Sequence, residues 1–280
     1  MTDNKFNPIT KFFGDKVPQD SELPLDLSGA FADAGIKKAY VIMITGRCGS
    51  TWLAHMLKDA GVGVPMEYFN EQSLRHYTGL VGADTIEDFF AKSLQEFSAN
   101  STFGFKINPT RLFWLGAKLD IDRTLVRGGV EWIDMRRNNI VKQAISFTRA
   151  QMTGAWHQIR GEGEQDETVE LPQSIFDDEY SDIRDNIWKN IRNIVQQERS
   201  IDQFYANRNM KPMRLLYEDL LDSRASVFSR VVTQILGSQP EDAGISLPET
   251  KTIKIATEEQ WELDMLRRFP SEIESVYRNR

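Results

Sequence analysis

The stretch AYVIMITGRCGSTWLAHMLKDAG, residues 39–61, decides the fold. Its first part, residues 39–45, is a continuous apolar run rich in β-branched side chains, which is typical of a strand buried on both faces of a parallel sheet. From Ser50, apolar residues recur at helical spacing until Gly61, so this part predicts a helix with Ser50 near its N-cap. Residues 46–49 therefore connect a strand to a helix by a glycine-containing turn.

This turn has the chemistry of an anion-binding site. Its backbone amides, the N-terminus of the following helix and the side chains of Arg47, Ser50 and Thr51 can all donate hydrogen bonds to a phosphate group. The loop of nucleoside triphosphatases requires Gly, four residues and then Gly-Lys-Ser/Thr. Here the leading glycine is missing and Ser50 stands at the lysine position. The turn therefore suits a phosphate group without demanding a triphosphate or a metal ion.

Three further segments, residues 103–107, 130–135 and 213–218, have the length and apolar character of strands. Each is followed by a helical pattern, and strands that alternate with helices form parallel sheets with right-handed crossovers. We therefore predict an α/β fold, a single domain with a central parallel sheet flanked by helices. A long helix before the last strand has an apolar stripe that predicts a face buried in the core or in a dimer. The stripe consists of Tyr180, Ile183, Ile187, Ile191 and Ile194.

Two segments are expected to be irregular. Residues 1–37 are interrupted by prolines, of which Pro8 is the first, so we expect a loosely structured lead-in before a domain that spans residues 38–280. Residues 161–173 carry many carboxylates and almost no apolar side chains, which predicts an exposed, mobile acidic loop.

The composition argues against several classes of protein. A net charge of -7 and a pI near 5.2 disfavour a general nucleic-acid binder, which needs a basic face. One cysteine, Cys48, cannot form an intrachain disulfide, and with three scattered histidines it cannot make a structural zinc site, so we expect metal-free chemistry. The chain shows neither a signal-peptide core nor a run that would insert stably into a membrane, so a cytoplasmic location is the expectation.

A second informative stretch is WIDMRRNNIVKQAISFTRA, residues 132–150. Its strand delivers Arg136 and Arg137 to the carboxyl edge of the sheet, where open α/β sheets bind their ligands. A helix is predicted to start at about residue 138 or 139, and Ser146 lies two turns along it. An arginine and a hydroxyl at these places can converge on a second anion.

Together these motifs resemble a known family. TGRCGSTWL (45–53) is similar to the 5′-phosphosulfate loop of sulfotransferases, and RRNNIVKQAIS (136–146) is similar to their 3′-phosphate motif. GVPMEYF, FGFK, SFTRAQMTGAW and IATEEQW follow with the order and spacing of the bacterial trehalose 2-sulfotransferase family and its lipopolysaccharide sulfotransferase relatives. The resemblance covers roughly residues 38–265. It implies a P-loop-like sulfotransferase fold, a homodimer, the donor 3′-phosphoadenosine 5′-phosphosulfate and the product adenosine 3′,5′-bisphosphate.

The resemblance also assigns the donor site. It implies that Arg47, Gly49, Ser50 and Thr51 hold the 5′-phosphosulfate, and that Arg137 and Ser146 hold the 3′-phosphate.

Two residues of the loop depart from the pattern of the family. Trp52 stands where the bacterial family usually has an aliphatic residue, and it either stacks on the adenine of the donor or packs as a core tryptophan. Cys48 stands where serine is more usual. Because a helix N-terminus favours a thiolate, we expect a low pKa at Cys48 and inhibition by alkylation, against which the donor protects.

The acceptor side is assigned in the same way. Glu67 matches the family glutamate proposed as general base, which takes the proton of an acceptor hydroxyl; His157 is a competing base. Lys106 ends a strand at the same edge, where a cation would stabilise charge on the transferring group. Arg149 lies one turn beyond Ser146, and either supports the 3′-phosphate or orients the acceptor. The acceptor itself is expected to be a hydroxyl of a carbohydrate, a glycolipid or a related small molecule.

Two alternatives stay open at this point. A small-molecule kinase would use the turn for a nucleoside triphosphate and Asp134 for magnesium, although the loop lysine is absent. A non-catalytic nucleotide-binding protein could be built on the same fold.

Overall fold

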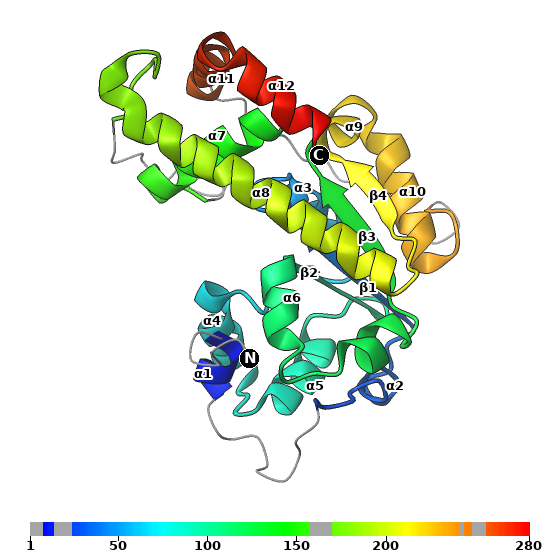
Figure 1. The fold of residues 1–280 in the computed structure, drawn as a ribbon. Coiled ribbons are helices and arrows are strands. Elements are labelled where there is room, and N and C mark those ends of the chain that lie inside the picture. Colours follow the sequence, from blue (N-terminus) through cyan, green and yellow to red (C-terminus); the bar gives the residue numbers. More distant parts are fainter. Residues whose placement is uncertain (1–7, 14–23, 157–169, 241–243, 248–255) are drawn as a thin grey trace.

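A parallel sheet of four strands runs through the centre of the protein (Figure 1). The strands are β1 (Lys38–Ile44), β2 (Thr102–Ile107), β3 (Glu131–Arg136) and β4 (Met213–Leu216), and their order across the sheet is β2-β1-β3-β4. The computed structural model describes residues 8–13, 24–156, 170–240, 244–247 and 256–280. The predicted single α/β domain with a parallel sheet flanked by helices is confirmed.

Helices cover both faces of the sheet and add a further layer beyond it (Figure 1). They are α1 (Pro8–Phe13), α2 (Ala30–Asp33), α3 (Ser50–Asp59), α4 (Glu71–Val81), α5 (Ile86–Glu96), α6 (Pro109–Leu115), the π-helical turn η2 (Asp122–Val126), α7 (Ile140–Thr153), the 3₁₀ turn η3 (Asp178–Tyr180), α8 (Ser181–Asn207), α9 (Tyr217–Asp222), α10 (Arg224–Leu236), α11 (Ala256–Arg268) and α12 (Pro270–Arg278). In the part of the chain that the structure describes, none of them is long and apolar enough to cross a membrane.

The apolar run of β1 is explained by its central place. Val41 and Met43 face a core formed with α4, α5 and α6, whereas Tyr40, Ile42 and Ile44 face a second core formed with α3 and α10. Since β1 pairs with β2 on one side and β3 on the other, its residues 40–44 are buried, and only its first two residues, Lys38 and Ala39, are accessible to solvent. This is the arrangement that a continuous hydrophobic strand predicts.

The long helix α8 joins two parts of the molecule. Ile187, Ile191 and Ile194 of the predicted stripe are buried in a third core with α7, α11 and α12, while Ile201 and Tyr205 near its other end belong to the first core. The prediction of an apolar face is confirmed, and this face packs within the domain. The helix therefore fixes the layer of α7 and α11 relative to the sheet.

Residues 8–13 of the N-terminal segment form a helix, where the sequence analysis expects loose structure. Pro8 does not interrupt a helix but begins one, at a position where a backbone N–H would have no helical partner. Ile9 and Phe13 of this helix are buried in the first core. The expectation that Pro8 interrupts the chain is therefore wrong at α1. Most of the predicted acidic loop, residues 161–173, lies outside the described residues, which include only its last four positions, 170–173.

Candidate active site

The carboxyl ends of the four strands bring the predicted site residues to one edge. The turn 45–49 follows β1, and the last paired residues of its neighbours, Ile107 and Met135, lie level with Met43 and Ile44. The segments that continue from β2, β3 and β4 therefore emerge beside the turn. This convergence places the site where open α/β sheets bind their ligands.

Close packing fixes the turn between two aromatic rings. Gly49 has a φ of 89° and caps α3, and a Cβ on it would lie 2.2 Å from the ring of Tyr217. A Cβ on Gly46 would lie 2.3 Å from the ring of Phe147. Only glycine fits at these contacts, and Gly49 also needs the left-handed conformation that glycine adopts without strain.

A glutamine from α7 secures the end of β1. Gln143 Nε2 donates to Thr45 Oγ1 at 2.9 Å and to the carbonyl oxygen of Gly46 at 2.7 Å. The turn and α7 are thus held together before any ligand contacts them. Since α7 also carries Ser146, this clamp relates the two predicted phosphate sites in space.

Arg47 connects the two predicted phosphate sites directly. Its Nε donates to Ser146 Oγ at 3.1 Å, and its Nη1 donates to the carbonyl oxygen of Trp156. Burial lowers the pKa of Arg47; the charge of Glu258 opposes this shift, and Arg149 and Arg137 add to it. Arg47, Arg137 and Arg149 therefore lie within electrostatic range of one another, and Glu258 is the carboxylate that opposes their effect on Arg47.

Arg137 is held at this edge with an unused donor. Its Cζ lies 4.9 Å from the centre of the Tyr217 ring, and its Nε is buried with no hydrogen-bond partner among the described residues. The carboxylate of Glu218 accepts from the backbone N–H groups of Asn138 at 2.8 Å and Asn139 at 3.1 Å. Tyr217 and Glu218 thus shape the Arg137 turn, in line with a structural role.

Arg149 is buried against α11. Its Nε donates to Glu258 Oε1 at 3.3 Å. The sequence analysis assigned no role to Glu258, although it lies in the IATEEQW motif that the resemblance rests on. A carboxylate on a helix of polar composition gives no sign of its partner, because the partner is 109 positions earlier in the chain.

Glu67 and Lys106 meet on the other side of the turn. Lys106 Nζ lies 3.7 Å from Glu67 Oε1 and donates to Thr51 Oγ1 at 3.4 Å. The pairing follows from the backbone, because Lys106 N donates to the carbonyl oxygen of Met66 at 2.9 Å. Glu67 also accepts from Asn70 Nδ2 at 3.3 Å and is 27% exposed. A carboxylate, a buried ammonium group and a hydroxyl of the turn therefore converge.

The environment of Cys48 corrects the prediction of a reactive thiol. Its side chain is fully buried in the second core, and burial raises the pKa of the thiol, while its hydrogen bonds with Ser50 only partly oppose this. The core position outweighs the helix N-terminus. The expectation of a low pKa is therefore wrong.

Two further predicted residues lie at the margin of the site. Trp52 is partly buried against the second core, with its ring 6.4 Å from that of Tyr217 in an edge-on arrangement. The structure therefore places the indole beside the ring on which Arg137 rests. His157 lies outside the described residues, and the chain is described up to Trp156, next to it.

Asp134 cannot take the role that a kinase would require. It is fully buried in β3, 2.9 Å from Arg136 Nη2 and 3.1 Å from Arg214 Nε. Arg136 is further engaged by Asp202 at 2.6 Å. These ion pairs neutralise the carboxylate inside the sheet. They also show that Arg136, unlike Arg137, is committed to holding β3 against α8, while Arg214 joins β4 to the same two carboxylates.

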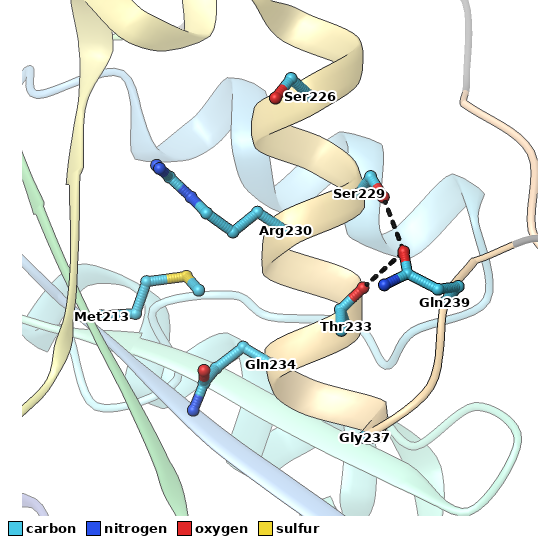
Figure 2. Close-up of a pocket in the computed structure, with 8 residues that line it drawn as sticks. All are labelled: Met213, Ser226, Ser229, Arg230, Thr233, Gln234, Gly237 and Gln239. Atoms are coloured by element: carbon cyan, nitrogen blue, oxygen red, sulfur yellow. Dashed lines mark hydrogen bonds between the residues drawn. The ribbon is translucent and has the colours of Figure 1, made fainter.

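A surface hollow elsewhere on the protein has no part in this site. Figure 2 shows it beside α10, where the hydroxyls of Ser229 and Thr233 both donate to Gln239 Oε1. Its lining includes none of the predicted site residues. The site is therefore defined by the convergence of charged groups at the sheet edge.

The fold and this edge define a class of protein. The first turn of the sheet has the hydrogen-bond donors of an anion cradle but lacks the lysine of triphosphatases. Arginines from other segments and a carboxylate paired with a lysine meet it, an arrangement typical of the P-loop-like sulfotransferases. The family model described as Stf0 sulphotransferase matches residues 39–106 and 115–270, so the chain belongs to this family and is a sulfotransferase. The resemblance seen in the sequence is thereby confirmed. No curated protein matches the chain.

Proposed function

We propose that this enzyme transfers a sulfuryl group from 3′-phosphoadenosine 5′-phosphosulfate to a hydroxyl of a carbohydrate, a glycolipid or a related small molecule, without a metal ion. The observation that carries the proposal is the position of Lys106. Its ammonium group lies within reach of both Thr51 in the anion cradle and Glu67, the proposed base. The ammonium group of Lys106 would therefore act on both the donor and the acceptor.

The residues of the cradle suit this donor. Arg47, with the amides of residues 48–51, would hold its 5′-phosphosulfate, and Arg137 with Ser146 its 3′-phosphate. The buried Nε of Arg137 supports this assignment, because a buried donor without a partner is costly and an anion would satisfy it. Trp52 would lie along the adenosine. The donor supplies a sulfuryl group on a phosphate, which is a good leaving group.

Glu67 would activate the acceptor. It takes the proton of the hydroxyl while the hydroxyl oxygen forms its bond to sulfur and the bond from sulfur to the bridging oxygen breaks. Adenosine 3′,5′-bisphosphate then leaves with the electron pair of that bond. Lys106 and the cradle amides are fixed cations and dipoles that stabilise the charge on the bridging oxygen. The contact of Glu67 with Lys106 supports Glu67 as the base, and His157 stays the competing candidate.

Two residues, Ser50 and Asp134, disfavour the alternative that the protein is a kinase. It requires a lysine in the turn, where Ser50 stands, and a free carboxylate at Asp134, which Arg136 and Arg214 neutralise. The homodimer remains a prediction from the family resemblance, and sedimentation velocity would measure it.

Calorimetric titration of the metal-free protein tests the donor assignment. We expect micromolar or tighter binding of adenosine 3′,5′-bisphosphate, weakened at least about tenfold in Arg137→Ala, because a charge-assisted contact contributes about 1.5–3 kcal/mol. ATP with Mg²⁺ is the comparison ligand. Binding of ATP with Mg²⁺ but not of the bisphosphate would refute the proposal.

A further inference from the structure

The helix α12 brings Arg280, which follows it, to the segment after β3 (Figure 1). Arg280 Nη2 donates to the carbonyl oxygen of Arg137 at 2.6 Å, and its Nη1 donates to that of Asn138 at 2.8 Å. Arg137 is the residue to which the 3′-phosphate of the donor is assigned. A side chain from the far end of the sequence therefore holds the backbone of the proposed phosphate-binding turn.

The guanidinium group of Arg280 is itself fixed by α8. Its Nε and Nη2 donate to the two carboxylate oxygens of Glu198, each at 2.6 Å, which is the paired geometry of the strongest ion pairs. Glu198 is buried, and the Arg280 side chain is 15% exposed. The neighbouring Arg199 donates from Nη2 to the carbonyl oxygen of Asn279 at 2.9 Å. The helix α8 therefore holds both the side chain of Arg280 and the backbone before it.

The ion pair between Arg280 and Glu198 gives direction more than stability. A buried ion pair is weak evidence for stability, because moving two charges out of water costs about as much as their attraction returns. A guanidinium group is planar and its N–H groups point in fixed directions. With one side of the group paired to Glu198, its remaining donors face the two carbonyl oxygens of the turn. The pair therefore fixes the turn relative to α8.

Two charged side chains of opposite sign hold the backbone of this turn. Glu218 accepts from the backbone N–H groups of the two residues after Arg137, and Arg280 donates to the carbonyl oxygens. The side chain of Arg137 rests on the ring of Tyr217, and its buried Nε has no hydrogen-bond partner among the described residues. The backbone is thus fixed while the side chain keeps a donor for a ligand, which is the arrangement of a preorganised site.

We propose that Arg280 and Glu198 are positioning residues of the donor site, which together hold the backbone of Arg137 so that its guanidinium group meets the 3′-phosphate. This inference rests on the proposed function. Both residues act through Arg137 and not by contact with the donor. Their effect therefore concerns nucleotides that carry a 3′-phosphate and leaves the binding of other nucleotides unchanged.

The test compares adenosine 3′,5′-bisphosphate with adenosine 5′-monophosphate, which differ only in the 3′-phosphate. Calorimetric titration measures the affinity for each in the wild type, in Arg280→Gln, in Arg280→Lys and in the double variant Arg280→Gln with Glu198→Gln. The double variant removes the contact with the carbonyl oxygens but leaves no buried charge without a partner, so it keeps the test open if Arg280→Gln alone does not fold. Arg278→Gln is the matched control, because this nearby arginine pairs with Glu274 and is 73% exposed.

We expect the preference for the bisphosphate over the monophosphate to fall about tenfold to a hundredfold in Arg280→Gln and in the double variant, as when a group that orients a metal ligand is removed. The affinity for the monophosphate should be the same in every variant. Arg280→Lys should recover only part of the loss, because an ammonium group cannot engage the carboxylate and both carbonyl oxygens together. Arg278→Gln should behave as the wild type.

Arg137→Ala connects the effect to its proposed cause. This substitution should lower the preference for the bisphosphate at least as much as Arg280→Gln does. Adding Arg280→Gln to Arg137→Ala should then have no further effect, because residues that act through one group are not additive.

Three results would overturn the inference while leaving the proposed function intact. The first is an unchanged preference for the bisphosphate in the double variant. The second is an equal loss of affinity for both nucleotides, which would give the ion pair a structural role alone. The third is a further loss when Arg280→Gln is added to Arg137→Ala. Failure of the wild type to bind the bisphosphate at all would instead refute the proposed function, and this inference with it.

Discussion

The ammonium group of Lys106 is held where its surroundings oppose its charge. The side chain is 3% exposed, and burial lowers its pKa from 10.5, while the charge of Glu67 opposes the shift. The proposed role requires the charged form. Since the pKa is lowered, the charge is lost on raising the pH before an ordinary lysine would lose it.

The alkaline limb of the pH profile should therefore report Lys106. We expect kcat/KM to fall as the pH rises toward 10.5, and we expect Lys106→Arg to move this fall to higher pH, because a guanidinium group stays charged there. The rate of labelled sulfuryl transfer between pH 6 and pH 10.5 measures both. An identical alkaline limb in the two proteins would show that the charge of Lys106 does not contribute to sulfuryl transfer.

Substitution of Glu67 tests the proposed base. Glu67→Gln keeps the size of the side chain but cannot accept the proton, so kcat should fall by about 10²–10⁴-fold, the usual contribution of a general base. The affinity for adenosine 3′,5′-bisphosphate, measured by calorimetry, should stay the same. Glu87→Gln on α5 is the control. If His157→Gln abolishes turnover and Glu67→Gln does not, the base is the histidine.

At the scale of elements, the tight turn before α3 depends on Gly49. An alanine there would meet the ring of Tyr217 and would also have to adopt a φ of 89°. We expect Gly49→Ala to lower the free energy of unfolding by about 1–3 kcal/mol and to weaken bisphosphate binding, since the strain falls on the cradle.

Gly129→Ala provides a matched comparison. Gly129 also has a positive φ, of 72°, but nothing lies within 4 Å of the Cβ that would be added. The difference between the two substitutions in thermal unfolding isolates the contact with Tyr217 from backbone strain. Equal destabilisation by both would show that the aromatic contact does not constrain the turn.

The elements themselves could be predicted from local patterns. The apolar run of β1 and the spacing after Ser50 are properties of neighbouring residues, and so is the start of α7, where Asn139 caps the helix by accepting from Lys142 N at 2.8 Å. The helix α1 was missed because proline at a first helical position looks the same in a sequence as proline that breaks a helix.

The partners of charged side chains could not be predicted in this way. Periodicity states which face a residue occupies but not which distant group it meets. Arg47 and Ser146 were each assigned from a motif, and only the fold brings them to 3.1 Å. The burial of Cys48 could not be predicted for the same reason. The core that covers its side chain includes residues of α10 and β4, which are far from it in the sequence.

At the scale of the whole molecule, the outer helical layer contributes a carboxylate to the proposed donor site. The helix α11 packs on α7 and carries Glu258, the carboxylate that Arg149 contacts. Glu258 is buried and is also the counter-charge of Arg47.

Removing this carboxylate should have opposite effects on stability and on binding. Glu258→Gln should lower the free energy of unfolding of the ligand-free protein by about 3 kcal/mol, because it leaves buried cations uncompensated. The bisphosphate should then bind more tightly and raise the melting temperature by more than in wild type. Glu259→Gln, at an exposed neighbouring position, is the control. Equal ligand-induced shifts in both variants would contradict this account.

The strand order β2-β1-β3-β4 has a consequence for how such an enzyme can be altered. In the proposed function, the turn after β1 and the segment after β3 would hold the donor, and Glu67 and Lys106 beside β2 would serve the acceptor. Recognition of the donor, which all such enzymes share, and recognition of the acceptor, which differs among them, would thus be built from separate stretches of chain. Substitutions beside the carboxyl end of β2 should therefore change the acceptor while the donor stays the same. This half of the sheet edge is the place for redesign of specificity.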